Sequence, residues 1–119
     1  MGEYESALEM FEKAEAFQRS KGRARETRIA IWTVARCLRS LKRVEEALSM
    51  QMKLKDEFDF AGEIDGYVFE EIGECLLALN RAEEARSYFA KAYEELSQDS
   101  WLAEKEPERL TRLKELGSV

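Results

Sequence analysis

The chain has 119 residues, a length that fits one domain, and 45% of its residues are hydrophobic and 37% charged. Its single proline and six glycines leave a composition that favours helices. The net charge of −6 argues against general binding of nucleic acid, which requires a basic surface. Because no apolar stretch is long enough to cross a membrane and two cysteines are too few for a disulfide scaffold, we expect a cytoplasmic protein.

The charge is distributed unevenly along the chain. Residues 1–17 carry a net charge of −4, residues 18–55 carry +8, and residues 56–119 carry −10. A basic middle segment therefore lies between two acidic ends.

The first predicted element, residues 2–14, has the sequence GEYESALEMFEKA and reads as a turn followed by the second helix of a helical hairpin. The first helix of that hairpin is absent from the sequence before it. We therefore expect an apolar face that the chain does not cover, comprising Tyr4, Leu8 and Phe11. Three explanations stay open: the helix is a simple edge, the chain is a piece of a longer array, or a second copy covers this face in a homodimer.

Two longer helical runs follow, at residues 28–41 and 65–79, and each leads through a turn into another helix, at residues 42–55 and 80–93. Apolar and small residues recur at helical spacing in both first helices. They are Ile31, Val34, Ala35, Leu38 and Leu41 in one run, and Phe69, Ile72, Gly73, Leu76 and Leu79 in the other. The two runs are thus equivalent first helices of two helix-turn-helix units.

The second helices align as well, on Ala7, Ala47 and Ala85, which are separated by 40 and 38 residues. Self-similarity at such a period indicates a repeat architecture. Small residues such as Gly73 and Ala85 let antiparallel helices approach closely, and Phe89 fills space toward the following helix.

This pattern resembles the tetratricopeptide repeat. The copy at residues 60–98 fits well, with Gly73 in its first helix, Asn80 at the turn, and Ala85, Phe89 and Ala92 in its second helix. The copy at residues 21–59 is degenerate, with Lys42 at the turn and Gln51 where a ring is usual, and residues 1–20 form a half repeat. The resemblance implies one all-α domain over residues 1–119, with hairpins stacked as a short right-handed solenoid.

Residues 99–117 depart from the repeat and predict a terminal capping helix. Asp99 or Ser100 can cap a short turn, Pro107 suits the first position of a new helix, and Gly117 lies where that helix would end. A narrow apolar stripe would cover the last repeat; it consists of Leu110, Leu113 and Leu116. The charged residues expected to face water are Glu108, Arg109, Arg112 and Glu115.

Catalysis has little support in the sequence. Histidine is absent, and no calcium loop, phosphate-cradling loop or metal-spaced cysteine set is present. Cys37 and Cys75 occupy equivalent repeat positions and are interpreted as buried structural thiols. We therefore expect no catalytic, cofactor-binding or metal-binding residues.

Binding is the favoured function, because the resemblance implies a concave groove lined by the first helices of the repeats. The residues expected to line it are Ile29, Trp32, Arg36, Arg39, Tyr67, Glu70, Glu74 and Leu77. Aromatic and arginine side chains are common at binding hot spots. A plainer alternative is that Arg36 and Arg39 pair with Glu70 and Glu74 between adjacent helices.

The sequence therefore predicts an adaptor that binds a protein or peptide ligand, with no nucleic acid or membrane partner. One alternative is self-assembly as a homodimer through the N-terminal half repeat. A second, less favoured alternative is an enzyme with an unrecognised active site.

Overall fold

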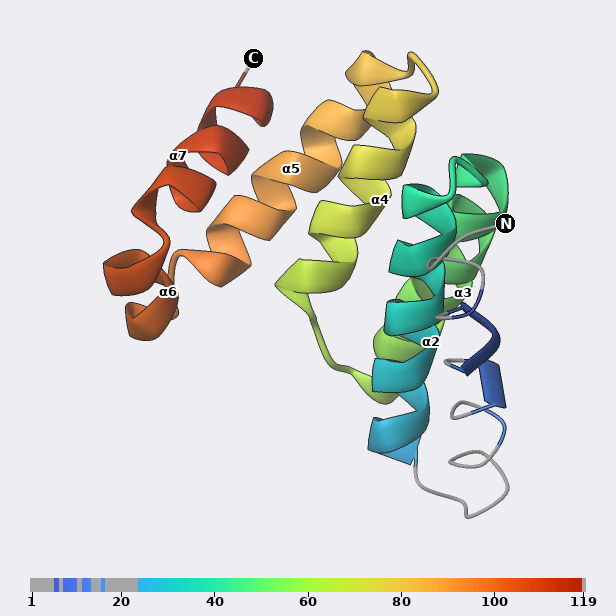
Figure 1. Ribbon diagram of the computed structural model, residues 1–119. Helices are drawn as coiled ribbons and strands as arrows, with labels where there is room; N and C mark the ends of the chain where they lie inside the picture. The colour runs from blue at the N-terminus through green and yellow to red at the C-terminus, as the bar shows by residue number, and fades with distance from the viewer. Residues whose placement is uncertain (1–5, 7, 11, 14–15, 17–23, 119) are drawn as a thin grey trace. The chain divides into compact units, whose positions relative to one another are not determined.

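A computed structural model describes residues 6, 8–10, 12, 13, 16 and 24–118 (Figure 1). These residues form helices and connecting turns, with no strand among them, so the prediction of an all-α protein is confirmed. The chain divides into two compact units, Met1–Leu54 and Lys55–Val119, with the boundary inside one helix.

Six helices follow one another from residue 24 onward. They are α2 (Ala24–Ser40), α3 (Val44–Ala61), α4 (Gly66–Ala78), α5 (Ala82–Leu96), α6 (Ser100–Lys105) and α7 (Pro107–Leu116). The predicted runs at residues 28–41 and 65–79 correspond to α2 and α4, and the helices that follow them correspond to α3 and α5. No helix among the described residues is both long enough and apolar enough to span a bilayer.

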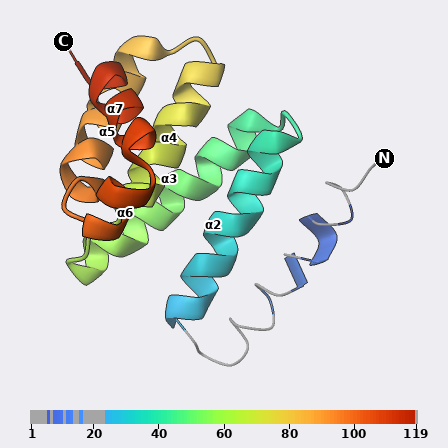
Figure 2. The same cartoon turned by 60° about the vertical axis from the view of Figure 1, so that its left-hand side comes forward.

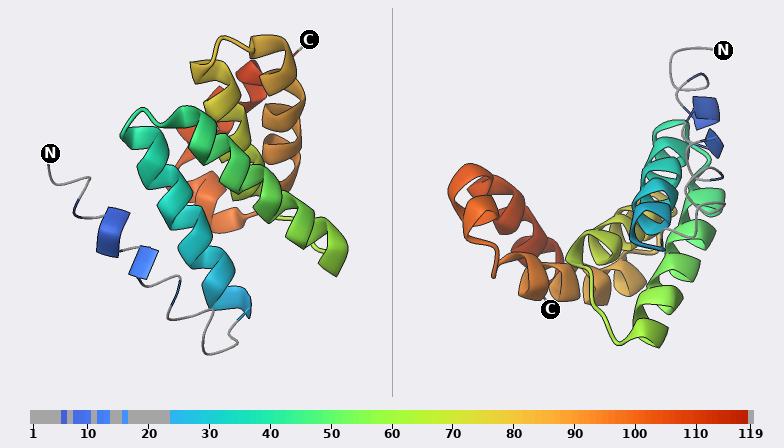
Figure 3. Two further views of the ribbon diagram at one scale, coloured as in Figure 1. Left: turned by 90° about the vertical axis from the view of Figure 1, so that its right-hand side faces the viewer. Right: turned by 90° about the horizontal axis from the view of Figure 1, so that it is seen from below.

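The first unit contains α2 and the first part of α3, which follow each other as an antiparallel hairpin (Figure 3, left). The buried side chains of α2 recur every three or four residues, as the sequence predicts. They are Thr27, Ile31, Val34, Ala35, Cys37 and Leu38 on α2, with Ala47, Gln51 and Leu54 buried on α3. Thr27 and Gln51 are the polar members of this set, and the Gln51 amide oxygen and nitrogen have no hydrogen-bond partner among the described residues.

Both hairpin turns have the same backbone geometry. Lys42 and Asn80, which lie 38 residues apart, have φ angles of 66° and 61°. In each turn the next residue donates its N–H across the helix end, from Arg43 to Leu38 O at 2.9 Å and from Arg81 to Leu76 O at 2.8 Å. These bonds satisfy carbonyls that the helix end leaves open.

An arginine and a glutamate reinforce each turn at equivalent positions. Arg43 Nη2 donates to Glu46 Oε2 at 2.8 Å, and Arg81 Nη2 donates to Glu84 Oε1 at 2.7 Å. The arginine hydrogen bonds lower the pKa of both carboxyl groups. The turns predicted at Lys42 and Asn80 are therefore true structural equivalents.

In the second unit α4 and α5 form a tightly packed hairpin. A Cβ atom added to Gly73 would lie 2.9 Å from Cε1 of Phe89, whose ring is fully buried. A Cβ atom on Gly66 would lie 2.8 Å from Cγ of Leu96. Contacts this short leave no room for a side chain, so both glycines permit close approach of the two helices. The prediction that Gly73 lets two antiparallel helices approach closely is confirmed, and the residue that it faces is Phe89.

The helices α6 and α7 complete the second unit. Asp99 Oδ1 accepts the N–H groups of Trp101 and Leu102 at 2.9 and 3.2 Å, so it caps α6, and α7 begins at Pro107 as expected. The α7 helix packs against α5, and Figure 2 shows α6 and α7 in front of that helix. A Cβ atom on Gly117 would lie 2.7 Å from the backbone nitrogen of Ala90, so the end of α7 almost touches the α5 backbone.

Leucines hold this capping segment in place. Leu102 and Leu113 are fully buried, Leu110 is buried and Leu116 is half-buried. Both cysteines are buried, as predicted. The stacking of the hairpins into a right-handed solenoid, and the single-domain organisation, stay predictions.

Candidate protein-binding surfaces

The α2 face consists of Ile29, Trp32, Arg36 and Arg39, the four α2 residues predicted to line the groove. Their spacing of three and four residues places them on one side of the helix, away from the buried set that includes Val34 and Leu38. Ile29 is 55% exposed, Arg36 is exposed, and Trp32 and Arg39 are half-buried.

Trp32 and Arg36 form the centre of the α2 face. The Arg36 guanidinium carbon lies 5.7 Å from the centroid of the Trp32 ring, within the range of a cation–π contact. This contact holds a planar cation beside a large ring at a partly exposed site. Such a pair offers a ligand both apolar area and directed hydrogen-bond donors.

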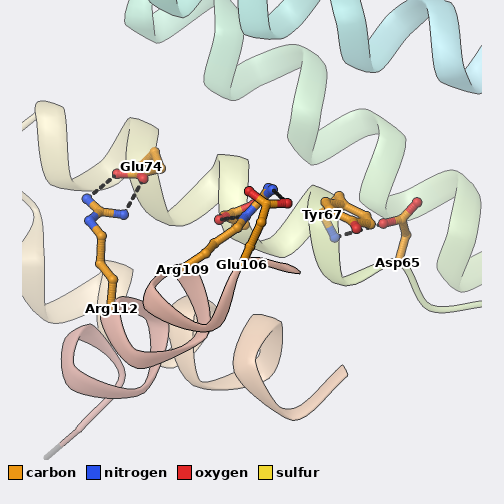
Figure 4. A network of polar contacts seen from close by, with 7 residues as sticks. Asp65, Tyr67, Glu74, Glu106, Arg109 and Arg112 are labelled. Carbon is orange, nitrogen blue, oxygen red and sulfur yellow. Dashed lines mark hydrogen bonds and ion pairs between the residues drawn. The ribbon is translucent and has the colours of Figure 1, made fainter. Parts of the chain in front are cut away.

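The four groove positions predicted on α4 lie in the second unit, and two of them pair with α7 (Figure 4). Arg109 Nε donates to Glu70 Oε2 at 2.9 Å, and Arg109 Nη2 donates to Glu70 Oε1. Arg112 Nη1 donates to Glu74 Oε2 at 2.5 Å, and Nη2 donates to Glu74 Oε1 at 3.0 Å. Both carboxylates are thus bound by two donors from one guanidinium.

Tyr67 belongs to the same network. The N-cap residue Asp65 accepts the Tyr67 N–H at 2.8 Å, which fixes the start of α4. The Arg109 guanidinium carbon lies 5.2 Å from the centroid of the Tyr67 ring, and Arg109 Nη1 lies 3.5 Å from Glu106 Oε2. Leu77, the fourth α4 position, is half-buried.

The network shifts the pKa values of two of its members. The hydrogen bond to Glu70 raises the pKa of the Arg109 guanidinium further above its usual value. Burial raises the pKa of the Tyr67 hydroxyl, although the Arg109 charge acts in the opposite direction. Both groups therefore keep their protons more firmly than in water.

The sequence prediction that Arg109 and Arg112 face water holds for Arg112, which is exposed although it pairs with Glu74, and was wrong for Arg109, which is half-buried. Their side chains turn toward α4 because two carboxylates there, one of them only 7% exposed, offer charged partners. The alternative in which Arg36 and Arg39 pair with Glu70 and Glu74 joins the two units and stays a prediction; within the second unit these carboxylates pair with the α7 arginines. Glu108 and Glu115 are exposed as predicted.

The α4–α5 hairpin, in which Gly73 on one helix faces the buried Phe89 ring on the other, is also the part of the chain that matches a known protein family. Residues 68–95 match the family model of the tetratricopeptide repeat. Comparisons with curated protein sequences and with solved structures return no match.

The matched tetratricopeptide repeat covers most of α4 and α5 and confirms the resemblance for the copy at residues 60–98. Repeats of this family generally mediate protein–protein interactions. In this chain α7 already binds the α4 carboxylates of the repeat, so part of the predicted groove surface is covered by the protein's own helix.

The predicted dimer face lies mostly outside the described residues, which do not include Tyr4 and Phe11. Leu8, however, is only 4% exposed, so the expectation that this side chain is left uncovered was wrong. Dimerisation through the N-terminal half repeat stays a prediction without further support.

Two features that carry the site were missed from the sequence. The pairing of α4 with α7 had one detectable signal: Glu70 and Glu74 share the four-residue spacing of one helix face, and Arg109 and Arg112 share a three-residue spacing. The second feature is the exposure of Phe60 and Ile64, which lie where α3 leads into α4. No sequence signal marks it, because the exposure of these side chains depends on where α3 ends.

Proposed function

We propose that this protein is a non-catalytic adaptor that binds another protein, or a peptide segment of one, through the α2 face. The observation that carries the proposal is the partly exposed stack of Trp32 and Arg36 beside the exposed Ile29. Tryptophan and arginine are the side chains most enriched at binding hot spots. The tetratricopeptide repeat in the second unit supports the same class of function.

The α4 positions contribute less to this proposed site than the sequence suggests. Glu70 and Glu74 already make bidentate ion pairs with α7, and Arg109 covers the Tyr67 ring. A ligand would have to replace these contacts before it could use the same atoms. We therefore assign the main contact to the α2 face.

The test is capture of proteins from an extract of the source cells on immobilised protein, followed by mass spectrometry. We expect the native chain to retain specific proteins other than itself, and Trp32→Ala and Arg36→Glu each to reduce their capture roughly tenfold or more. The control is Lys53→Glu, which makes the same charge change at an exposed position of α3 outside the α2 face.

Circular dichroism of every variant checks that the helices are retained. Arg36 is exposed, so its substitution is not expected to disturb folding even if that of the half-buried Trp32 does. If the native chain and both face variants capture the same proteins in equal amounts, the α2 face is not the binding site.

A further inference from the structure

A second surface of unusual composition lies where α3 ends and leads into α4. The acidic corner consists of Asp56, Glu57, Asp59, Phe60 and Ile64. Phe60 is 97% exposed and Ile64 is 63% exposed, although both side chains are large and apolar. Residues 55–65 contain five carboxylates and one lysine.

The charges of the acidic corner oppose the dipole of the helix that carries them. The C-terminal end of a helix is negative, so it favours cations and disfavours carboxylates. The last turn of α3 nevertheless contains no basic residue, and Asp59 lies within it. A positively charged partner at this end of α3 would therefore meet a favourable field from both the carboxylates and the helix.

Only part of this charge is compensated within the chain. Lys55 Nζ bonds Asp59 Oδ2 at 2.8 Å and lies 4.0 Å from Asp56 Oδ1, and the bond to Asp59 raises the pKa of Lys55. Glu57 is exposed and makes no ion pair with any described residue. Two exposed apolar side chains surrounded by such charge are typical of a contact surface with a polar rim.

The α2 face has the opposite sign and the same mixture of apolar and charged groups. Ile29 and Trp32 supply apolar area, and Arg36 makes no ion pair with a carboxylate of the described residues. The surrounding segment, residues 18–55, has a net charge of +8, whereas residues 56–119 have −10. One chain therefore carries both halves of a complementary contact.

The geometry points to self-association in which the α2 face of one copy binds the acidic corner of a second copy. Arg36 would face the carboxylates near the end of α3, while Ile29 and Trp32 would cover Phe60 and Ile64. The contact is heterologous, because each copy contributes a different surface. This inference rests on the proposed function, since it identifies a partner for the same α2 face.

Self-association of this kind would regulate the adaptor. A copy whose α2 face is occupied by a second copy cannot present that face to another protein. Binding of an external protein and self-association would then compete, and the protein concentration would set the balance between them.

The experiment measures the molar mass of the intact chain by light scattering over a dilution series. We expect the native protein to exceed the 13.8 kDa of one chain as concentration rises, and to do so less at about 0.5 M than at about 0.05 M salt. A face variant, Trp32→Ala with Arg36→Glu, and a corner variant, Phe60→Ser with Ile64→Ser, should each weaken association about tenfold or more.

Mixing the two variants gives the decisive result. The corner variant keeps an intact α2 face and the face variant keeps an intact acidic corner, so we expect an equimolar mixture to form a one-to-one complex. Charge reversal provides a milder pair: Arg36→Glu mixed with Glu57→Lys should also associate. Lys53→Glu is the matched control and should behave as the native chain does.

Three outcomes would overturn the inference. They are a native chain that stays monomeric at all concentrations, association that neither variant weakens, and variants that weaken association but do not form a complex when mixed. The last outcome would indicate an isologous contact, in which the α2 face of one copy meets the α2 face of the other and the two acidic corners meet in the same way. None of these results removes the proposed function, which is tested separately by the capture of other proteins.

Discussion

Gln51 offers the most direct test of the packing in the first unit. Its side chain is fully buried on α3, and within the part of the chain that the structure describes neither its amide oxygen nor its amide nitrogen has a hydrogen-bond partner. Burying an amide without a partner costs about 1 to 3 kcal/mol in proteins. Gln51→Met removes both polar atoms with almost no change of volume or helix propensity. We therefore expect this variant to raise the free energy of unfolding by about 1 to 3 kcal/mol.

Urea denaturation followed by circular dichroism measures this gain, with fluorescence as a second probe of whether the transition has one step. At about 4 °C per kcal/mol, the melting temperature should rise by roughly 4 to 12 °C. Gln98→Met is the control, because Gln98 is exposed and donates to Glu94 O at 3.0 Å, so the same substitution should bring no gain there. If Gln51→Met lowers stability, the buried amide is hydrogen-bonded and the reasoning is wrong.

Three further predictions concern the second unit. Gly73→Leu should lower the free energy of unfolding by about 1 to 3 kcal/mol, because any side chain there meets the Phe89 ring; an unchanged urea midpoint would contradict the close packing. Arg109→Met should lower the free energy of unfolding by roughly 1 to 3 kcal/mol, because it leaves the buried Glu70 carboxylate without its arginine. In a double-mutant cycle, adding Glu70→Gln should recover part of this loss. Because burial raises the pKa of Tyr67, the folded state keeps the hydroxyl proton to higher pH than the unfolded chain does, so the stability of the fold should fall above about pH 10. Tyr67→Phe should reduce this fall in melting temperature, and the same alkaline melting profile in the native chain and the variant would contradict the prediction.

The repeat was predictable from the sequence because its signals are local. Lys42 and Asn80 align at the same offset from Ala47 and Ala85, and each adopts the positive φ that its turn requires. The same alignment marked Gly73 as a point of close approach between antiparallel helices, and the buried Phe89 ring lies against it. Periodicity and turn position together were sufficient for this part of the fold.

The candidate sites were harder to predict because they depend on contacts between distant residues. Three leucines fixed which side of α7 packs on α5, but they did not decide whether the flanking Arg109 and Arg112 turn to water or to α4. That choice depends on the carboxylates of Glu70 and Glu74, nearly forty residues away. Likewise, the exposure of Phe60 follows from the point at which α3 ends, and no periodic pattern marks that residue as a surface position.

The two matching turns have a consequence for the order in which the protein folds. Each is closed by hydrogen bonds between residues no more than five apart, and each has its own pair of arginine and glutamate three residues apart. Contacts of such short range close quickly, because little chain entropy is lost in forming them. The α7 helix instead docks through buried leucines and through ion pairs that join residues 38 and 39 apart, so all of its contacts with α4 and α5 are of longer range. We therefore expect the hairpins to form early and the C-terminal helix to be the last element to dock and the first to detach.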